Sequence, residues 1–223
     1  GLIGPNGAGK TTVFNLLTKV YQPTHGTILL DGQDTHNMTT AQVNRAGIAR
    51  TFQNIRLFND LTVEENVTVA MDAQMKYSMV SGIFRLPSFW KEEKVAHERA
   101  LELLSLFHME DLANVKAGSL PYGAQRRLEI VRALATNPSL LLLDEPAAGM
   151  NPSETAELTE TIRRIRDEFN IAVLLIEHDM SLVMGICEGI AVLNFGRIIA
   201  KGTPDEIRNN PQVIEAYLGK KEG

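Results

Sequence analysis

Short apolar runs alternate with segments of helical periodicity along most of this chain. The runs at residues 140–143 and 171–176 are wholly apolar, which is typical of strands buried on both faces of a sheet. Further strands are predicted at residues 26–30, 47–51, 190–193 and 197–200, the last two as a hairpin. This alternation predicts an α/β fold with a mainly parallel sheet and a small antiparallel part.

Several helix starts are marked by a capping residue followed three positions later by a glutamate. These pairs are Thr62 and Glu65, Asn151 and Glu154, and Thr203 and Glu206. In the last two, proline stands at the first helical position, where its missing N–H costs nothing. Between about residues 64 and 135 the pattern is mostly helical. We therefore expect a helical subdomain over 64–135, inserted into an α/β core formed by residues 1–63 and 136–223.

The charge balance and hydropathy limit the partners of the chain. Its 22 Lys and Arg against 27 Asp and Glu give a net charge of -5, and nucleic-acid binders usually carry a basic excess. We therefore expect no nucleic-acid partner. No segment reaches the roughly 18 apolar residues of a membrane-spanning helix, and the best candidate, residues 79–90, is interrupted by Arg85 and Pro87. Work at a membrane would therefore depend on partner subunits.

A glycine-rich segment carries the first chemical motif. Four residues separate its outer glycines, then Lys and Thr follow, and a helical pattern comes next. In such a phosphate loop, backbone N–H groups point at a phosphate, the lysine reaches the β- and γ-phosphates, and the hydroxyl ligates Mg²⁺. The start of the helix adds its positive dipole end. The residues expected to bind nucleotide here are Gly4, Pro5, Asn6, Gly7, Ala8, Gly9, Lys10, Thr11 and Thr12.

Other candidate residues follow predicted strands. Asp144 and Glu145 end an apolar run, which delivers both carboxylates to the sheet edge where the phosphate loop opens. Asp144 is predicted to hold Mg²⁺, and Glu145 to polarise an attacking water. Gln53 would ligate Mg²⁺ and sense the γ-phosphate, and His178 would contact that phosphate and orient the water. Taken alone, Gln53 is more simply a surface amide and His178 a hydrogen-bonded strand-end residue.

In their order along the chain, these motifs resemble the ATP-binding subunits of ABC transporters. The diagnostic segment is similar to the LSGGQ signature of that family and leads into a helix at residues 125–134. It consists of Leu120, Pro121, Tyr122, Gly123 and Ala124. The resemblance implies a RecA-like P-loop NTPase that uses ATP and Mg²⁺. It also implies a head-to-tail dimer, with ATP between one subunit's phosphate loop and the other's signature, Glu145 as catalytic base and Gln53 as the link to membrane subunits.

Longer stretches resemble the branched-chain amino-acid ATP-binding subunits of bacteria. They are residues 50–58, 81–89, 144–152, 175–180 and 207–219. The resemblance implies import of leucine, isoleucine and valine with two permeases, a periplasmic binding protein and a second, related ATPase, at the cytoplasmic face of the bacterial inner membrane. Other cargo, namely urea, amides or lipopolysaccharide, remains open. So does a soluble ABC ATPase of translation or DNA repair, although the acidic, single-cassette chain shows no basic surface. The intact catalytic motifs argue against a non-catalytic regulator.

The chain departs from the general family pattern in its signature. Pro121 replaces a serine, Tyr122 a glycine and Ala124 a glutamine, and Asn151 replaces an aspartate expected to cross the dimer. Since proline has neither a hydroxyl nor an N–H, we expect a weak contact across the dimer and a heterodimer whose two sites differ. The chain begins without Met, directly before the phosphate loop. We expect it to be truncated at the N-terminus, so that the adenine-stacking aromatic residue of the family lies upstream of Gly1.

Overall fold

The computed structural model describes residues 1–71 and 87–218, without the side chains of residues 87–89 and 218. The chain forms two compact units, one made of Gly1–Gln53 and Ser139–Gly223 and the other of Asn54–Pro138. The second unit begins at Asn54, about ten residues before the helical subdomain predicted from residue 64. The loop before the first helix belongs to this unit because its backbone forms hydrogen bonds within the unit. The N–H groups of Ala117 and Gly118 donate to the carbonyls of Leu61 and Asn59.

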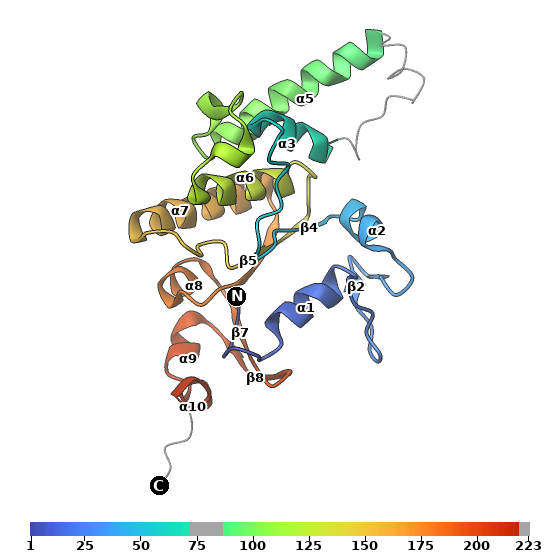
Figure 1. Cartoon of the computed structure of the whole chain (residues 1–223). Coiled ribbons are helices and arrows are strands. Elements are labelled where there is room, and N and C mark those ends of the chain that lie inside the picture. Colours follow the sequence, from blue (N-terminus) through green and yellow to red (C-terminus); the bar gives the residue numbers. More distant parts are fainter. Residues whose placement is uncertain (72–86, 219–223) are drawn as a thin grey trace. The chain divides into compact units, whose positions relative to one another are not determined.

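A sheet forms the centre of the first unit (Figure 1). It has six strands in the order β4-β5-β6-β1-β7-β8. Its strands are β1 (Leu2–Ile3), β4 (Ile48–Arg50), β5 (Leu140–Asp144), β6 (Ala172–Ile176), β7 (Ile190–Asn194) and β8 (Arg197–Gly202). All neighbours are parallel except β7 and β8, which are antiparallel. The predicted α/β fold with a mainly parallel sheet is therefore confirmed.

Two details of the strands differ from the sequence prediction. The strand expected at residues 26–30 is only β2 (Leu29–Leu30), paired with β3 (Gln33–Asp34). It is short because its partner turns away after Thr35, whose carbonyl accepts from the N–H of Met38. β5 is buried except for the half-buried Leu140. β6 is exposed at its first residue, Ala172, which pairs with Leu140 at the amino-terminal end of both strands.

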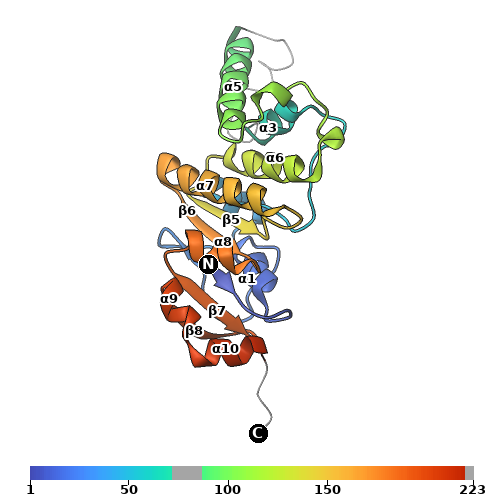
Figure 2. The same ribbon diagram turned by 90° about the vertical axis from the view of Figure 1, so that its left-hand side faces the viewer.

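Helices cover both faces of this sheet. They are α1 (Lys10–Leu17), α2 (Thr40–Arg45), α7 (Pro152–Phe169), α8 (Met180–Ile186), α9 (Pro204–Arg208) and α10 (Pro211–Leu218). α1 and α2 lie on one face, while α7 and α8 lie on the other (Figure 1, Figure 2). Phe14 of α1 and Val43 of α2 pack with Leu142 and Ile176 of the sheet in one buried cluster. Burial of such side chains stabilises the fold by roughly 1.5–3 kcal/mol each, so the sheet is a rigid support for the loops at its strand ends.

The described part of the second unit is helical. Its elements are α3 (Val63–Met71), α5 (Pro87–Ser105), the short 3₁₀ helices η2 (Glu110–Leu112) and η3 (Ala117–Ser119), and α6 (Tyr122–Leu134). Among the described residues, no helix has both the length and the apolarity needed to cross a membrane. Most of the stretch at residues 79–90, including much of the resemblance at 81–89, lies outside the described residues.

The capping boxes predicted from the sequence are present. Thr203 and Glu206 exchange hydrogen bonds at the start of α9, and Asn151 and Glu154 do the same at the start of α7. Thr62 and Glu65 exchange the same pair of bonds at the start of α3. Since each box satisfies backbone N–H groups that a helix end leaves unpaired, local sequence alone determines where these helices begin.

Candidate functional site

The glycine-rich loop joins β1 to α1 at the carboxyl edge of the sheet. At Gly4, an added Cβ would lie 2.0 Å from the carbonyl oxygen of Leu193, so only glycine fits beside β7. Gly7 has φ +77, a conformation that favours glycine, and an added Cβ there would meet no described atom within 4 Å. The loop ends at Gly9, the N-cap of α1. The loop is therefore open above Gly7 and closed against β7 below, as a phosphate cradle requires.

Lys10 lies in the first turn of α1 and turns back over the loop. Its Nζ donates to the carbonyl oxygens of Gly4 at 2.7 Å and Pro5 at 3.0 Å. Burial lowers the pKa of Lys10, while the charges of Glu145 and Asp144 act to raise it. Thr11 and Thr12 are exposed beside it. The lysine therefore lies in the field of both carboxylates that the sequence singles out.

Asp144 ends β5 and is 2% exposed. Its Oδ2 accepts from Nη2 of Arg50 at 2.9 Å, and its backbone N–H donates to the hydroxyl of Thr51 at 3.2 Å. Arg50 and Thr51 belong to the end of the neighbouring strand β4 and the residue after it. The register of two parallel strands, Arg50 beside Leu142, thus fixes the position of this carboxylate.

Glu145 follows directly and has φ +50, an unusual conformation for a residue with a side chain. Its backbone N–H donates to the carbonyl of Ile176 at 2.9 Å, which ties the turn to β6. Its carboxylate accepts from Nε2 of Gln53 at 3.3 Å, and Nε2 of His178 lies 2.9 Å from its other oxygen. Gln53, Glu145 and His178, each at the end of a different strand, therefore form one chain of contacts.

Glu177 is part of this arrangement, although sequence reasoning assigned it no role. It is 4% exposed, and its carboxylate accepts from the N–H groups of Ala147, His178 and Asp179 at 3.0, 2.7 and 3.2 Å. It therefore joins the turn after Glu145 to the turn that carries His178. The available signal was a charged residue directly after a wholly apolar strand, since buried carboxylates need partners.

The predicted signature residues lie in the other unit, around the start of α6. Pro121 is the N-cap and offers no side-chain hydrogen bond to the helix. The ring of Tyr122 is 49% exposed and lies under the guanidinium of Arg126, 5.7 Å from its centroid. Leu120 and Ala124 are buried. The exposed surface of this segment therefore consists of Pro121, Tyr122 and backbone.

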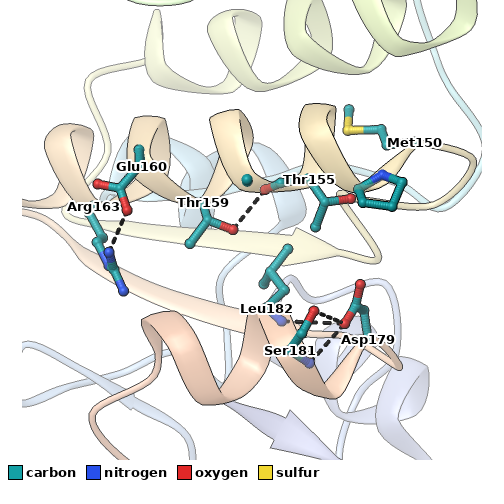
Figure 3. Close-up of a pocket in the computed structure, with 10 residues that line it drawn as sticks. Met150, Thr155, Thr159, Glu160, Arg163, Asp179, Ser181 and Leu182 are labelled. Atoms are coloured by element: carbon teal, nitrogen blue, oxygen red, sulfur yellow. Dashed lines mark hydrogen bonds and ion pairs between the residues drawn. The ribbon is translucent and has the colours of Figure 1, made fainter.

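Two features flank the site within the first unit. Burial raises the pKa of Tyr217 on α10, while a hydrogen bond with the Gly4 backbone acts in the opposite direction, so the last helix contacts the phosphate loop. A cavity of about 440 Å³ lies between α7 and α8 (Figure 3). Asp179 caps α8 there, accepting from Ser181 and Leu182, and Arg163 pairs with Glu160. These charged groups have partners within the chain, and the cavity reaches the His178 turn only at Asp179, the residue that follows His178.

Comparison with known proteins agrees with this geometry. A family model described as ABC transporter matches residues 1–148, and one described as branched-chain amino acid ATP-binding cassette transporter matches residues 197–222. The chain is 53% identical to the high-affinity branched-chain amino acid transport ATP-binding protein LivG of Escherichia coli K12, over 98% of this chain and 86% of that protein. It is 51% identical, over the same shares, to the corresponding protein BraF of Pseudomonas aeruginosa.

Similar solved structures are also ATP-binding cassettes. The crystal structure of the ADP conformation of an ATP-binding cassette of an ABC transporter matches with a TM-score of 0.82 and 31% identity, over 98% of this chain and 87% of that one. A dimeric cassette bound to ADP and phosphate matches with a TM-score of 0.76 and 26% identity, over 91% and 84%. The predicted P-loop fold, nucleotide binding and enzyme class are thereby confirmed. The chain belongs to the ABC transporter family of ATP-binding cassettes, whose members are ATPases.

Proposed function

We propose that this chain hydrolyses ATP to power the import of branched-chain amino acids through an ABC transporter. The observation that carries the proposal is the contact chain Gln53–Glu145–His178, beside the phosphate loop, in a chain 53% identical to a protein named for that transport. The family match at residues 197–222, described by the same cargo, adds support.

The reaction would use residues that the first unit already brings together. The loop of residues 4–12 would bind the phosphates through its backbone N–H groups from Asn6 onward and through the ammonium of Lys10. Glu145 would accept a proton from the attacking water, because it is an acceptor held by two neighbours. Nε2 of His178 and the amide of Gln53 would hold the direction of that carboxylate and meet the γ-phosphate. Such preorganised groups lower the barrier without reorganising during the reaction.

The site also suits magnesium. Asp144, Thr11 and Gln53 offer a carboxylate, a hydroxyl and an amide oxygen, the hard oxygen donors that Mg²⁺ prefers beside nucleotide phosphates. Asp144 is rigidly held by β4, whereas Thr11 is exposed at the start of α1. Bound there, the ion would neutralise phosphate charge.

The signature segment would act in a dimer. We propose that Leu120, Pro121, Tyr122, Gly123 and Ala124 meet ATP held by the phosphate loop of a second ATPase subunit. Because Pro121 lacks a hydroxyl, this contact would depend on backbone and on the exposed Tyr122. Unequal contacts favour a heterodimer with a related subunit. Further partners would be two permeases and, indirectly, a periplasmic binding protein, at the cytoplasmic face of the inner membrane.

A second cargo has one observation in its favour. The chain is 35% identical to a lipopolysaccharide export system ATP-binding protein of Acidithiobacillus ferridurans, over 98% of this chain and 84% of that protein. The identity is well below the 53% shared with the amino-acid protein, so we place lipopolysaccharide second.

The test is uptake of labelled leucine by bacteria that lack their own branched-chain ATPase subunit. We expect uptake to return with the protein and with Glu98→Gln, a matched change in an exposed helical pair with Lys94. Glu145→Gln should not restore it. If the protein is expressed and hydrolyses ATP but moves no leucine alongside matching permeases, the cargo assignment is wrong. Lipopolysaccharide export would then be measured.

A further inference from the structure

Arg50 lies at the end of β4, and its side chain forms a buried ion pair with Asp144. Its side chain is 7% exposed, and the Asp144 carboxylate that it meets is 3% exposed. Removing two charges from water costs several kcal/mol per ion unless geometry and hydrogen bonds compensate. A buried ion pair of this kind is weak evidence for a role in stability. A role in the nucleotide site would explain why the pair lies at this position.

The guanidinium joins two elements of the nucleotide site. Nη2 donates to Oδ2 of Asp144 at 2.9 Å, and Nη1 donates to Oδ1 of Asn15 at 2.6 Å. Asn15 lies on α1, one helical turn after Thr11. One planar group therefore spans from the strand that carries Asp144 to the helix that carries Thr11.

The surroundings of Arg50 fix the plane of this group. Its guanidinium carbon lies 5.4 Å from the ring centroid of Phe14 and 5.1 Å from that of Phe52. Both distances are within the range of cation–π attraction. Its buried Nε finds no hydrogen-bond partner among the described residues. An unpartnered buried donor is unfavourable, which indicates that the placement serves the two Nη contacts.

We propose that Arg50 is a positioning residue for the magnesium site, setting the separation of the Asp144 carboxylate and the Thr11 hydroxyl. The inference depends on the proposed function, in which both residues hold the ion. The ion pair with Arg50 uses Oδ2 of Asp144, so Arg50 acts directly on the carboxylate that would hold the ion. Losing outer-shell partners of this kind typically weakens metal affinity by about 10–100-fold.

The proposal requires arginine itself. A lysine would keep the charge, but a single ammonium on a flexible chain does not hold two acceptors in a fixed plane. Arg50→Lys therefore keeps the positive charge but removes the planar group that would hold Asp144 and Asn15 in position. Arg50→Met removes both while keeping an unbranched apolar chain between the two phenylalanines.

The test measures the affinity of a fluorescent, non-hydrolysable ATP analogue in EDTA and during a Mg²⁺ titration. We expect Arg50→Lys and Arg50→Met to raise the half-maximal Mg²⁺ concentration by about 10–100-fold, with affinity in EDTA unchanged. Asn15→Ala, which removes only the α1 contact, should act in the same direction with a smaller shift. Arg132→Met, which removes an arginine stacked over Phe58 in the other unit, should change neither quantity.

The outcomes separate this inference from the function on which it rests. If the unaltered protein responds to Mg²⁺ and Arg50→Lys responds at the same concentration, the role of Arg50 is overturned and the function stands. If the unaltered protein shows no response to Mg²⁺, the proposed magnesium site and this inference both fall. Should Arg50→Met not fold, Arg50→Lys and Asn15→Ala decide the question.

Discussion

The strand ends of the first unit and the signature segment of the second differ in how they carry chemistry. At the strand ends, Asp144, Glu145 and Glu177 each have partners within the same unit, over distances of 2.7–3.3 Å. At the start of α6, Pro121 offers no side-chain hydrogen bond to the helix. The acidic side chains of the first region are held by partners within the unit, whereas the exposed surface of the second consists of Pro121, Tyr122 and backbone.

Under the proposed function, the first region would hold the catalytic charges, and the second would contact ATP bound to another subunit. Hydrolysis needs charges held in fixed directions, and the parallel strands supply these through their register. Recognition across a dimer needs only an accessible surface that another subunit completes. We therefore expect changes at Asp144 and Glu145 to have larger effects than changes at the signature.

Asp144→Asn tests whether the strand ends are held by internal charge. The change leaves Arg50 buried beside a neutral amide, and breaking a buried pair typically costs about 3–5 kcal/mol. Urea unfolding of the protein measures the loss. Asp167→Asn breaks an exposed pair with Arg166 and should change stability by less than about 1 kcal/mol. Equal stability of the two variants would contradict the account of a charge-held site.

Pro121→Ser tests whether the signature is limited by its missing hydroxyl. A hydrogen bond to a charged group contributes about 1.5–3 kcal/mol, so we expect the ATP concentration for half-maximal dimer formation to fall roughly tenfold or more. Stability should change little, because the gain of about 1 kcal/mol from a serine cap offsets the loss of proline's restraint on the unfolded chain. Pro121→Ala serves as the control, because it removes the proline without adding a hydroxyl. An equal fall in the ATP concentration with that variant would show that the serine hydroxyl is not the cause.

Asp179→Ala has the smallest expected effect and depends on pH. Hydrogen bonds from Ser181 and Leu182 lower the pKa of Asp179 below its usual 3.8. Because the folded pKa is the lower one, this stabilisation is complete above the unfolded pKa and is lost as pH falls through the folded value. We expect the variant to lose about 1 kcal/mol at neutral pH, with the difference shrinking below about pH 4. Thermal unfolding across pH measures it, and a difference that grew on acidification would refute the assignment.

Local signals predicted much of the fold and of the candidate site. The spacing of Gly4 and Gly9 before Lys10 places the phosphate loop, since glycine conformations and the lysine are properties of adjacent residues. Apolar runs ending in Asp144 or before His178 likewise place side chains at one sheet edge. Capping boxes fix helix starts for the same reason.

The parts that escaped prediction depend on contacts distant in sequence. Arg50 meets Asp144 across 94 positions, and Glu177 meets Ala147 across 30. Their roles follow from which strands are neighbours and in what register, and the pattern of any single strand does not contain that information. The late start of β2, at Leu29 and not at Gly26, similarly depends on the turn that its partner makes after Thr35.

The most direct test of the central claim is ATP turnover by Glu145→Gln, measured together with the amount of ATP that stays bound. If Glu145 is the base held by Gln53 and His178, turnover should fall by about 10²–10⁴-fold while ATP remains bound, because the phosphate loop is untouched. Turnover at the rate of the unaltered protein would contradict the account and leave the proton acceptor to be sought elsewhere.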